Sequence, residues 1–314
     1  MNSLIIPVYK NESTISALFK QIQIIHASIA DLELVFVIDG SPDESGALIE
    51  IEIKKHGLRG KIVQLSRNFG SFAAIKAGLD QAMGPYFAVM AADCQEPPDL
   101  IVKFFDALQS DACDVVIGTR ITRSDPLTSR WSSGIFWSLY RRLIQPEVPP
   151  GGVDVFGCNQ QFRDHLLQLN ESHSSLIGQL FWLGFRRLCI PYDRQVRSSG
   201  KSAWTLRKKI RYLSDSFFAF SDLPIKFLLF IGCLGFLIAL FFALLVLVAK
   251  LSGQIQVPGY TTIIIVVSMF AGINSLGFGI VGHYVWRAFE NTKARPHTVI
   301  QSIAQYPEDP ETHD

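Results

Sequence analysis

Two long runs without charged side chains, both near the C-terminal end, constrain the fold of this chain most strongly. No Asp, Glu, Lys or Arg occurs in residues 227–249, and a second such run extends from 254 to 285. A helix needs about 20 apolar residues to cross the hydrocarbon core of a bilayer. Both runs are long enough, so the sequence predicts a two-helix transmembrane hairpin over 226–289, preceded by a water-soluble domain over 1–200.

Basic residues flank this predicted hairpin on both sides, whereas the loop between the two runs has only Lys250. Such an asymmetry places both flanks in the cytoplasm. Because no signal peptide opens the chain, we expect a multi-pass protein of the inner (cytoplasmic) membrane with its soluble domain and both termini cytoplasmic. The flanking residues are Lys201, Arg207, Lys208, Lys209 and Arg211 before the first run, and Arg287, Lys293 and Arg295 after the second.

The segments on either side of the hairpin have their own composition. Residues 201–225 mix aromatic and basic side chains, which is typical of an interfacial juxtamembrane helix; an ordinary surface helix is the alternative. The segment 290–314 is predicted to be a cytoplasmic tail, acidic and disordered from 304 onward. Small residues of the second run offer a packing face, either for a homo-oligomer or within the hairpin: Gly272, Ser275, Gly279 and Gly282.

The bulk composition excludes some classes of partner. The net charge is +1, so no strong positive field favours nucleic acid. The five cysteines are scattered without a Cys-x-x-Cys pair, and reduced packing thiols are the plain interpretation for a cytoplasmic domain.

Short apolar runs alternate with helix-length amphipathic segments over the first 120 residues. The expected strands are 2–8, 32–38, 61–65, 86–92 and 114–118, and the expected helices are 12–29, 44–56, 71–83 and 98–110. This alternation predicts an α/β, Rossmann-like domain with a mainly parallel sheet. Ligands bind beyond the carboxyl ends of strands in such sheets. Farther along, we expect helices at 126–150 and 174–184 and a strand at 188–193.

The first two expected strands end in polar residues. Asn11 can cap the next helix, and Asp39 can accept hydrogen bonds from a ribose or a base. The alternative for the second strand end is a simple turn in which Asp43 caps the following helix. No Gly-x-Gly-x-x-Gly follows the first strand and no Walker loop is present, which disfavours a dinucleotide oxidoreductase and a P-loop ATPase.

Asp93 and Gln95 follow the fourth expected strand, two positions apart. Oxygen-bearing side chains at this spacing along an extended segment point the same way and can hold Mg²⁺ or Mn²⁺, with substrate phosphates as further ligands. Helix capping before Pro98 is the plainer alternative.

Two groups of basic residues are candidate phosphate ligands, because guanidinium groups suit phosphate geometry. Exposed charge without a ligand is the alternative. The candidates are Arg120, Arg123 and Arg130 after the fifth strand, and Arg197 and Lys201 before the hairpin.

The order and spacing of these motifs resemble family 2 glycosyltransferases, and within them the polyprenyl-phosphate sugar synthases. The resemblance covers nearly the whole chain. The matching strings include Ile6-Pro7-Val8-Tyr9-Lys10-Asn11-Glu12, Val37-Ile38-Asp39-Gly40-Ser41, Leu65-Ser66-Arg67-Asn68-Phe69-Gly70, Asp93-Cys94-Gln95-Glu96-Pro97-Pro98, Gly118-Thr119-Arg120 and Gly200-Lys201-Ser202.

The resemblance implies a GT-A fold, a UDP- or GDP-linked sugar donor, Mg²⁺ or Mn²⁺, a polyprenyl-phosphate acceptor and inversion at the sugar. The lipid-linked sugar would serve envelope glycan modification. By position, Asp93 and Gln95 would hold the metal and the donor diphosphate, and Asp154 would face the reaction centre. The base pocket would be lined by Pro7, Tyr9, Glu12 and Asp39, and the acceptor phosphate held by Arg120, Arg123, Arg130, Arg197 and Lys201.

The chain also departs from the family pattern. Ile38 and Ala91 replace acids that the family usually has, and Ser71-Phe72 stands where Lys-Glu is common. One rival is therefore a non-catalytic nucleotide-sugar-binding scaffold. Another is a glycosyltransferase with a different acceptor, such as a processive synthase, although Leu127 stands where the Gln of a Gln-x-x-Arg-Trp string would be.

Overall fold

The computed structural model describes residues 1–29, 31–120, 155–171, 174–195 and 259–307, with scattered residues between 138 and 153 and between 225 and 252. The helix expected at 126–150 therefore lies largely outside the described residues, and the interfacial helix expected at 201–225 almost entirely so.

The described strands form one eight-stranded sheet in the order β7-β5-β6-β4-β1-β2-β3-β8. The pairs β1–β2, β1–β4, β2–β3 and β5–β7 are parallel, whereas β6 and β8 run antiparallel to their neighbours. The predicted α/β domain with a mainly parallel sheet is thereby confirmed. The strands are β1 (Asn2–Val8), β2 (Leu32–Ile38), β3 (Gly60–Leu65), β4 (Tyr86–Val89), β5 (Val115–Arg120), β6 (Phe156–Asn159), β7 (Arg187–Tyr192) and β8 (Ile300–Tyr306).

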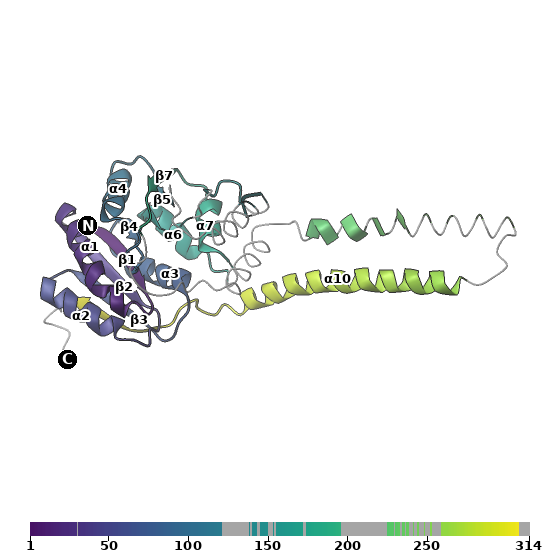
Figure 1. The fold of residues 1–314 in the computed structure, drawn as a ribbon, viewed down its shortest axis with the longest axis horizontal. Coiled ribbons are helices and arrows are strands. Elements are labelled where there is room, and N and C mark those ends of the chain that lie inside the picture. Colours follow the sequence, from purple (N-terminus) through teal and green to yellow (C-terminus); the bar gives the residue numbers. More distant parts are fainter. Residues whose placement is uncertain are drawn as a thin grey trace.

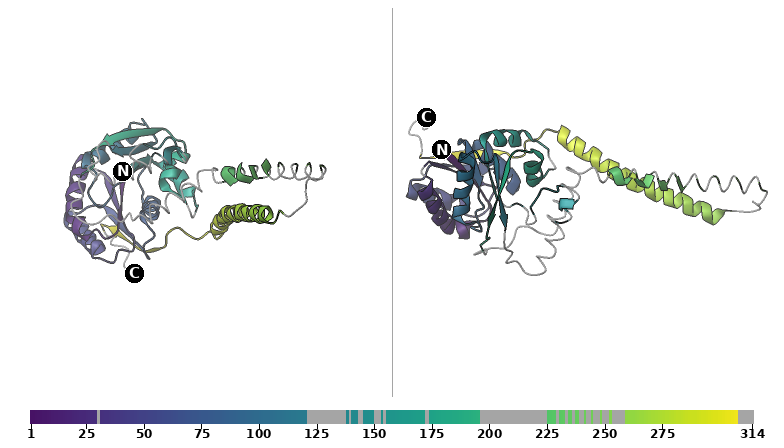
Figure 2. Two further views of the ribbon diagram at one scale, coloured as in Figure 1. Left: turned by 45° about the vertical axis from the view of Figure 1, so that its right-hand side comes forward. Right: turned by 90° about the horizontal axis from the view of Figure 1, so that it is seen from above.

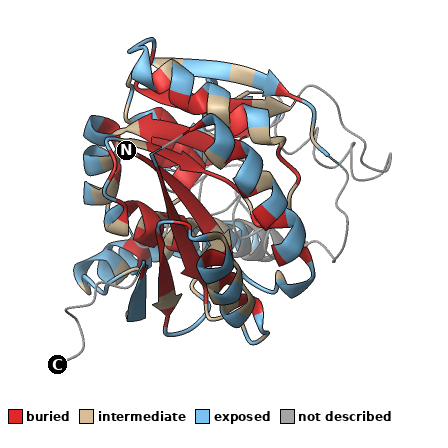
Figure 3. Ribbon diagram, turned by 90° about the vertical axis from the view of Figure 1, so that its left-hand side faces the viewer, coloured by how far each residue is buried: buried red, intermediate tan, exposed pale blue. Residues whose placement is uncertain are grey.

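Helices cover both faces of the sheet, so the central strands are buried on both sides, whereas the outer helix faces and the edge strands β7 and β8 meet solvent (Figure 3). One face packs against α1 (Ile15–Ser28), α2 (Ser45–His56) and α4 (Pro98–Gln109). The other packs against α3 (Ser71–Gln81), α6 (Gln160–Gln168) and α7 (Leu176–Trp182). A short 3-10 turn (Glu12–Thr14) precedes α1.

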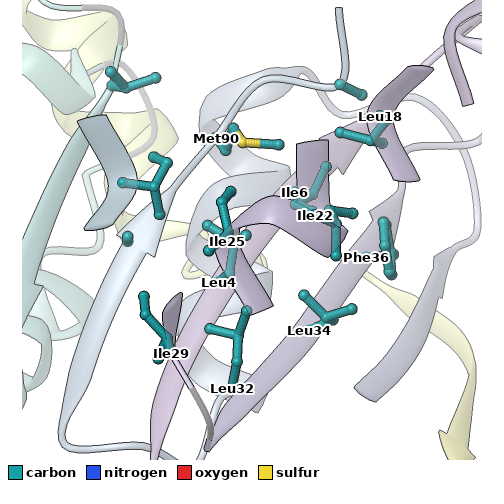
Figure 4. Packing of buried hydrophobic residues seen from close by; sticks show 14 of the residues in the cluster. Leu4, Ile6, Leu18, Ile22, Ile25, Ile29, Leu32, Leu34, Phe36 and Met90 are labelled. Carbon is teal, nitrogen blue, oxygen red and sulfur yellow. The ribbon is translucent and has the colours of Figure 1, made fainter. Parts of the chain in front are cut away.

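Alternating residues of each central strand supply the two cores, since successive side chains of a strand point to opposite faces. Figure 4 shows Ile22 and Ile25 of α1 beside Ile6 and Leu4 of β1. The apolar residues of α1 recur at three- and four-residue spacing, which places them on one buried stripe. This packing fixes the register in which β1 and β2 end, and therefore where their loops emerge.

Two strands were not predicted. The short strand β6 lies between β4 and β5, and only four residues make it too brief for a periodicity signal. The strand β8 pairs with β3 at the opposite edge of the sheet. Residues 304–306 were predicted to be disordered, which was wrong, because pairing with β3 orders them.

The long helix α10 (Tyr260–Thr292) projects away from the sheet domain, and the N-terminus lies on that domain (Figures 1 and 2). Helical residues between 225 and 248 run beside α10, with Leu228 facing Gly277 and Gly235 facing Phe270 and Ile273. Among the described residues, no helix combines the length and apolarity needed to span a membrane.

Candidate functional site

The loops that follow β1, β2, β3, β4, β5 and β7 all emerge at one edge of the sheet, because these six strands point the same way. Of the predicted site residues, the described ones are gathered at this carboxyl edge or at the strand ends beside it: Pro7, Tyr9, Glu12, Asp39, Asp93, Gln95 and Arg120. The predicted residues Arg123, Arg130, Asp154, Arg197 and Lys201 lie outside the described residues.

Asp39 ends the second strand and holds the loop before α3. Its side chain is only 2% exposed, and its two carboxylate oxygens accept hydrogen bonds from the amides of Phe69 (2.7 Å) and Gly70 (2.9 Å). Burial raises the pKa of Asp39 above its usual value, against the opposing effect of these two bonds and the nearby Arg67 charge. Each carboxylate oxygen has a second lone pair, so the group can still accept from a ligand.

Gly40 makes this arrangement possible. Its φ is +56°, and a Cβ at this position would lie 2.3 Å from the carbonyl carbon of Arg67. A residue with a side chain would therefore be strained and would push the 66–70 loop away from Asp39.

The loop after β1 is joined to the loop after β2 through Asp43. The Asp43 carboxylate accepts from the hydroxyls of Ser41 and Ser45 and from the amide of Glu12 (3.2 Å). Burial acts to raise the pKa of Asp43, but these hydrogen bonds outweigh it and lower the pKa. Asp43 also accepts weakly from the Ser45 amide (3.4 Å), but the N-cap residue of α2 is Glu44, so the alternative in which Asp43 caps this helix was wrong.

The loop after β1 carries further backbone constraints. The Asn11 side chain accepts from the amide of Tyr9 (3.0 Å), and the Lys10 amide donates to Ser41 (2.8 Å). Lys10 has a φ of +57°, a conformation that costs energy for a side-chain-bearing residue. Tyr9 is left 37% exposed at the rim of the edge, where a ring can stack on a flat ligand.

The loop after β4 is acidic and strained. Cys94 has a φ of +56° between Asp93 and Gln95. Burial, together with the charges of Asp93 and Glu96, raises the pKa of the Cys94 thiol to about 11. Both carboxylates therefore lie near this thiol, and the loop itself is bound to the 3-10 turn, where Thr14 donates to the carbonyl of Ala92 (2.8 Å).

Gln95 connects this loop to the segment after β7. Its side-chain oxygen accepts a hydrogen bond from Arg194, and its side-chain amide donates to the carbonyl of Gln195 (3.3 Å). The Gln195 amide in turn donates to the Gln95 carbonyl (2.9 Å). Arg194 was not among the predicted site residues, although it lies two positions beyond a strand end, the rule that identified Arg120.

The donor set around Asp93 limits what metal it can bind. Among the described residues, no group of three or more His, Cys, Asp and Glu side chains is arranged to hold a cation. The Gln95 oxygen already accepts from a guanidinium. One carboxylate fits Mg²⁺ or Mn²⁺ only when water and substrate phosphates complete the coordination, as is common for Mg²⁺.

The sheet and its polar carboxyl edge agree with a sequence comparison that identifies the family. The profile of glycosyl transferase family 2 matches residues 3–169. The chain belongs to glycosyl transferase family 2. It is therefore a glycosyltransferase with a GT-A-like α/β domain.

Relatives of this family 2 enzyme align over almost its whole length. The putative glycosyltransferase CsbB of Bacillus subtilis (strain 168) is 30% identical over 303 residues, covering 95% of this chain and 91% of the relative. The bactoprenol glucosyl transferase of Shigella phage SfX is 26% identical over 304 residues, 96% and 98% of the two chains. The undecaprenyl-phosphate 4-deoxy-4-formamido-L-arabinose transferase of Edwardsiella ictaluri (strain 93-146) is 27% identical over 306 residues, 96% and 94%.

Solved structures resemble the sheet domain less closely. Glucosyl-3-phosphoglycerate synthase from Mycobacterium tuberculosis, in complex with Mn²⁺, UDP-glucose and phosphoglyceric acid, has a TM-score of 0.49 and 18% identity, covering 70% of this chain and 77% of that one.

Proposed function

We propose that this enzyme transfers a hexose from a nucleotide sugar to a polyprenyl phosphate at the cytoplasmic face of a membrane, with inversion at the sugar. The observation that carries the proposal is the extent of the match to the phage SfX bactoprenol glucosyl transferase. It spans 96% of this chain, far beyond the family 2 region of residues 3–169, and so includes the hairpin.

The surface of the hairpin supports a membrane location. Large apolar side chains of α10 are exposed along its length, from Ile263 and Val267 to Phe278, which is 78% exposed. A soluble surface of this kind would be an aggregation hazard, whereas lipid tails would cover it at no cost. At the domain end of the helix, Lys293 lies over the rings of Trp286 and Phe289, the residue types that favour the headgroup level.

The residues of the carboxyl edge divide the proposed reaction between them. Tyr9 and Asp39 would bind the base and ribose, and Asp93 would bind the donor diphosphate through a cation. A divalent cation held by Asp93 and the diphosphate would neutralise charge on the leaving nucleotide. The acceptor phosphate is already ionised near pH 7, so Arg120 and the basic residues beyond it would mainly aim its oxygen at the anomeric carbon. Asp154 would orient the acceptor or stabilise the developing positive charge.

A reconstituted transfer assay tests this proposal. The full chain is placed in liposomes containing undecaprenyl phosphate and is given labelled UDP- or GDP-sugars with Mg²⁺ or Mn²⁺. We expect label in the lipid fraction with at least one donor, and an α-linked donor should give a β-linked product. If no donor ever labels the lipid, the proposal fails, and nucleotide-sugar binding without transfer would favour the scaffold alternative.

Asp93→Ala provides the residue-level test in the same assay. Loss of the carboxylate that neutralises charge through the cation should lower transfer about 100-fold or more. Asp80→Asn is the matched control, because Asp80 is exposed on α3 away from this loop. Full activity of Asp93→Ala would remove the metal assignment.

A further inference from the structure

We propose that Arg194 binds the distal phosphate of the donor diphosphate and that Gln95 is its positioning residue. This inference rests on the proposed function, since it names a ligand for the same donor. Under this proposal Gln95 is not a metal ligand. Instead, Gln95 holds the Arg194 guanidinium against the loop after β4.

The sheet order places Arg194 on the far side of the donor. Tyr9 and Asp39 follow β1 and β2, whereas the segment carrying Arg194 follows β7 and reaches the β4 loop from the β5 side. A nucleotide whose base lies at β1 and β2 extends its phosphates toward β4. The guanidinium therefore meets the diphosphate at the end farthest from the base.

The negative charge of the loop after β4 favours a cation at this point. Asp93 and Glu96 lie on either side of Cys94 and Gln95, and a diphosphate adds further negative charge. A guanidinium offers five N–H donors in a rigid fork that matches phosphate oxygens. One donor of Arg194, on Nη2, is used by Gln95. Arg194 is only partly buried, so the rest of the fork can meet a ligand, whereas its Nε is buried and makes no hydrogen bond with the described residues.

A purely structural role for Arg194 explains the contacts less well. The loop after β4 and the segment after β7 are already joined by two bonds between Gln95 and Gln195. The guanidinium is not required for that junction. Its bond to the Gln95 oxygen instead fixes the orientation of a charged group at the ligand-binding edge.

The test compares nucleotide binding by the full-length protein in detergent micelles, measured by titration calorimetry at fixed Mg²⁺. UDP is paired with UMP, and GDP with GMP. In Arg194→Gln we expect the diphosphate Kd to rise about 10- to 100-fold, the range of one lost charge-assisted bond, and the monophosphate Kd to change less than about 3-fold. Arg194→Lys should recover part of the loss, because it restores the charge without the fork.

Two further variants separate positioning from folding. Gln95→Ala leaves the charge in place but unfixed, so we expect a smaller rise in the diphosphate Kd, about 3- to 10-fold. Arg59→Gln is the matched control. Arg59 is exposed just before β3, at the amino ends of the parallel strands and therefore opposite the carboxyl edge, so its loss should leave both Kd values unchanged.

Several results would overturn the inference. They are unchanged UDP and GDP binding by Arg194→Gln, an equal loss for diphosphate and monophosphate, or a raised KM for polyprenyl phosphate with donor binding intact. A wild-type protein that binds neither diphosphate contradicts both proposals. Wild-type binding that depends on Arg194, without any transfer to lipid, contradicts the proposed function alone.

Discussion

The two halves of the sheet are held together by partners that lie at different distances along the chain. In the half made of β3, β2, β1 and β4, the strand side chains are almost all buried, and Glu33 of β2 accepts from Ser3 of β1 (2.6 Å) and pairs with Lys61 of β3 (3.3 Å). In the half made of β6, β5 and β7, the partners come from more distant parts of the chain. There Asp114 accepts from Arg186 and from the Asn159 side chain (3.0 Å).

The same contrast appears at the carboxyl edge. The proposed base side, made of the loops after β1, β2 and β3, is tied together by hydrogen bonds from backbone amides to Asp39 and Asp43. The proposed phosphate side, made of the loop after β4 and the segment after β7, joins Gln95 to Arg194, 99 residues apart in the chain. The proposed base side is thus formed by strands that neighbour each other in the sheet, whereas the proposed phosphate side depends on the docking of distant segments.

Gly40→Ala should have the largest effect on the base side. The new Cβ would lie 2.3 Å from the Arg67 carbonyl carbon at a φ of +56°, so strain and overlap together should cost about 3 kcal/mol of unfolding free energy. Urea unfolding measures it. Gly57→Ala is the control, with a φ of +59° and nothing within 4 Å; it should cost only about 1 kcal/mol. Equal costs would show that the close approach of the two loops is unimportant.

Asp39→Asn should come next and should affect binding as well as folding. An amide has only one oxygen for the two N–H groups of Phe69 and Gly70, so one buried donor loses its acceptor, at a cost of about 2 kcal/mol. We also expect weaker UDP or GDP binding in calorimetry. Asp80→Asn on the exposed face of α3 should change unfolding by less than about 0.5 kcal/mol. Wild-type stability and binding in Asp39→Asn would refute the proposed base side.

Asp114→Asn tests the half made of β6, β5 and β7, and should cost about 1–2 kcal/mol at pH 7, because the partner arginine is half exposed. Hydrogen bonds from Arg186 hold the pKa of Asp114 below its usual value, against the effect of burial. The stability that Asp114 contributes is therefore present above about pH 3.9, the unfolded value, and is lost as the pH falls through the lower folded pKa. Urea unfolding of both proteins from pH 7 to pH 3 should show the difference shrinking below about pH 4. A constant difference would contradict the ion-pair explanation.

Tyr306→Phe should have the smallest effect. The Tyr306 hydroxyl bonds to the half-exposed Glu50 of α2, while its buried ring, which lies beneath Lys54, is retained. We expect a loss below about 1 kcal/mol and unchanged sugar transfer. Thermal unfolding and the transfer assay check both, with Tyr306→Ala as the variant that removes the ring. A loss of transfer in Tyr306→Phe would link the β3 edge to the site.

The sequence predicted the longer elements of both halves well, and in the second half the strand expected at 188–193 is observed at Arg187–Tyr192. The strand expected at 32–38 has those bounds, and the helices expected at 44–56 and 71–83 begin within one residue of the observed ones. Periodicity reports burial, and these segments are buried by their own neighbours. By contrast, β6 is short and β8 lies on a sheet edge, so neither has a strong periodic pattern.

The candidate site shows a similar division. Asp39, Asp93 and Gln95 were predicted as site residues because strand ends mark ligand positions in parallel sheets. The contact between Gln95 and Arg194 was not, because a pair formed across 99 residues leaves no local signal. Likewise, the family motif could not show that the Gln95 oxygen faces a guanidinium, since that depends on where β7 ends.

The antiparallel pairing of β8 with β3 also sets an order of events during synthesis. Residues 60–65 leave the ribosome long before 300–306, and all of α10 is made between them. Until then the β3 edge carries unpaired peptide groups, the kind of edge that recruits other chains. If synthesis stalled within the hairpin, the β3 edge of the nascent chain would stay unpaired. Quality-control factors that recognise unpaired strands would then have time to bind and remove the chain.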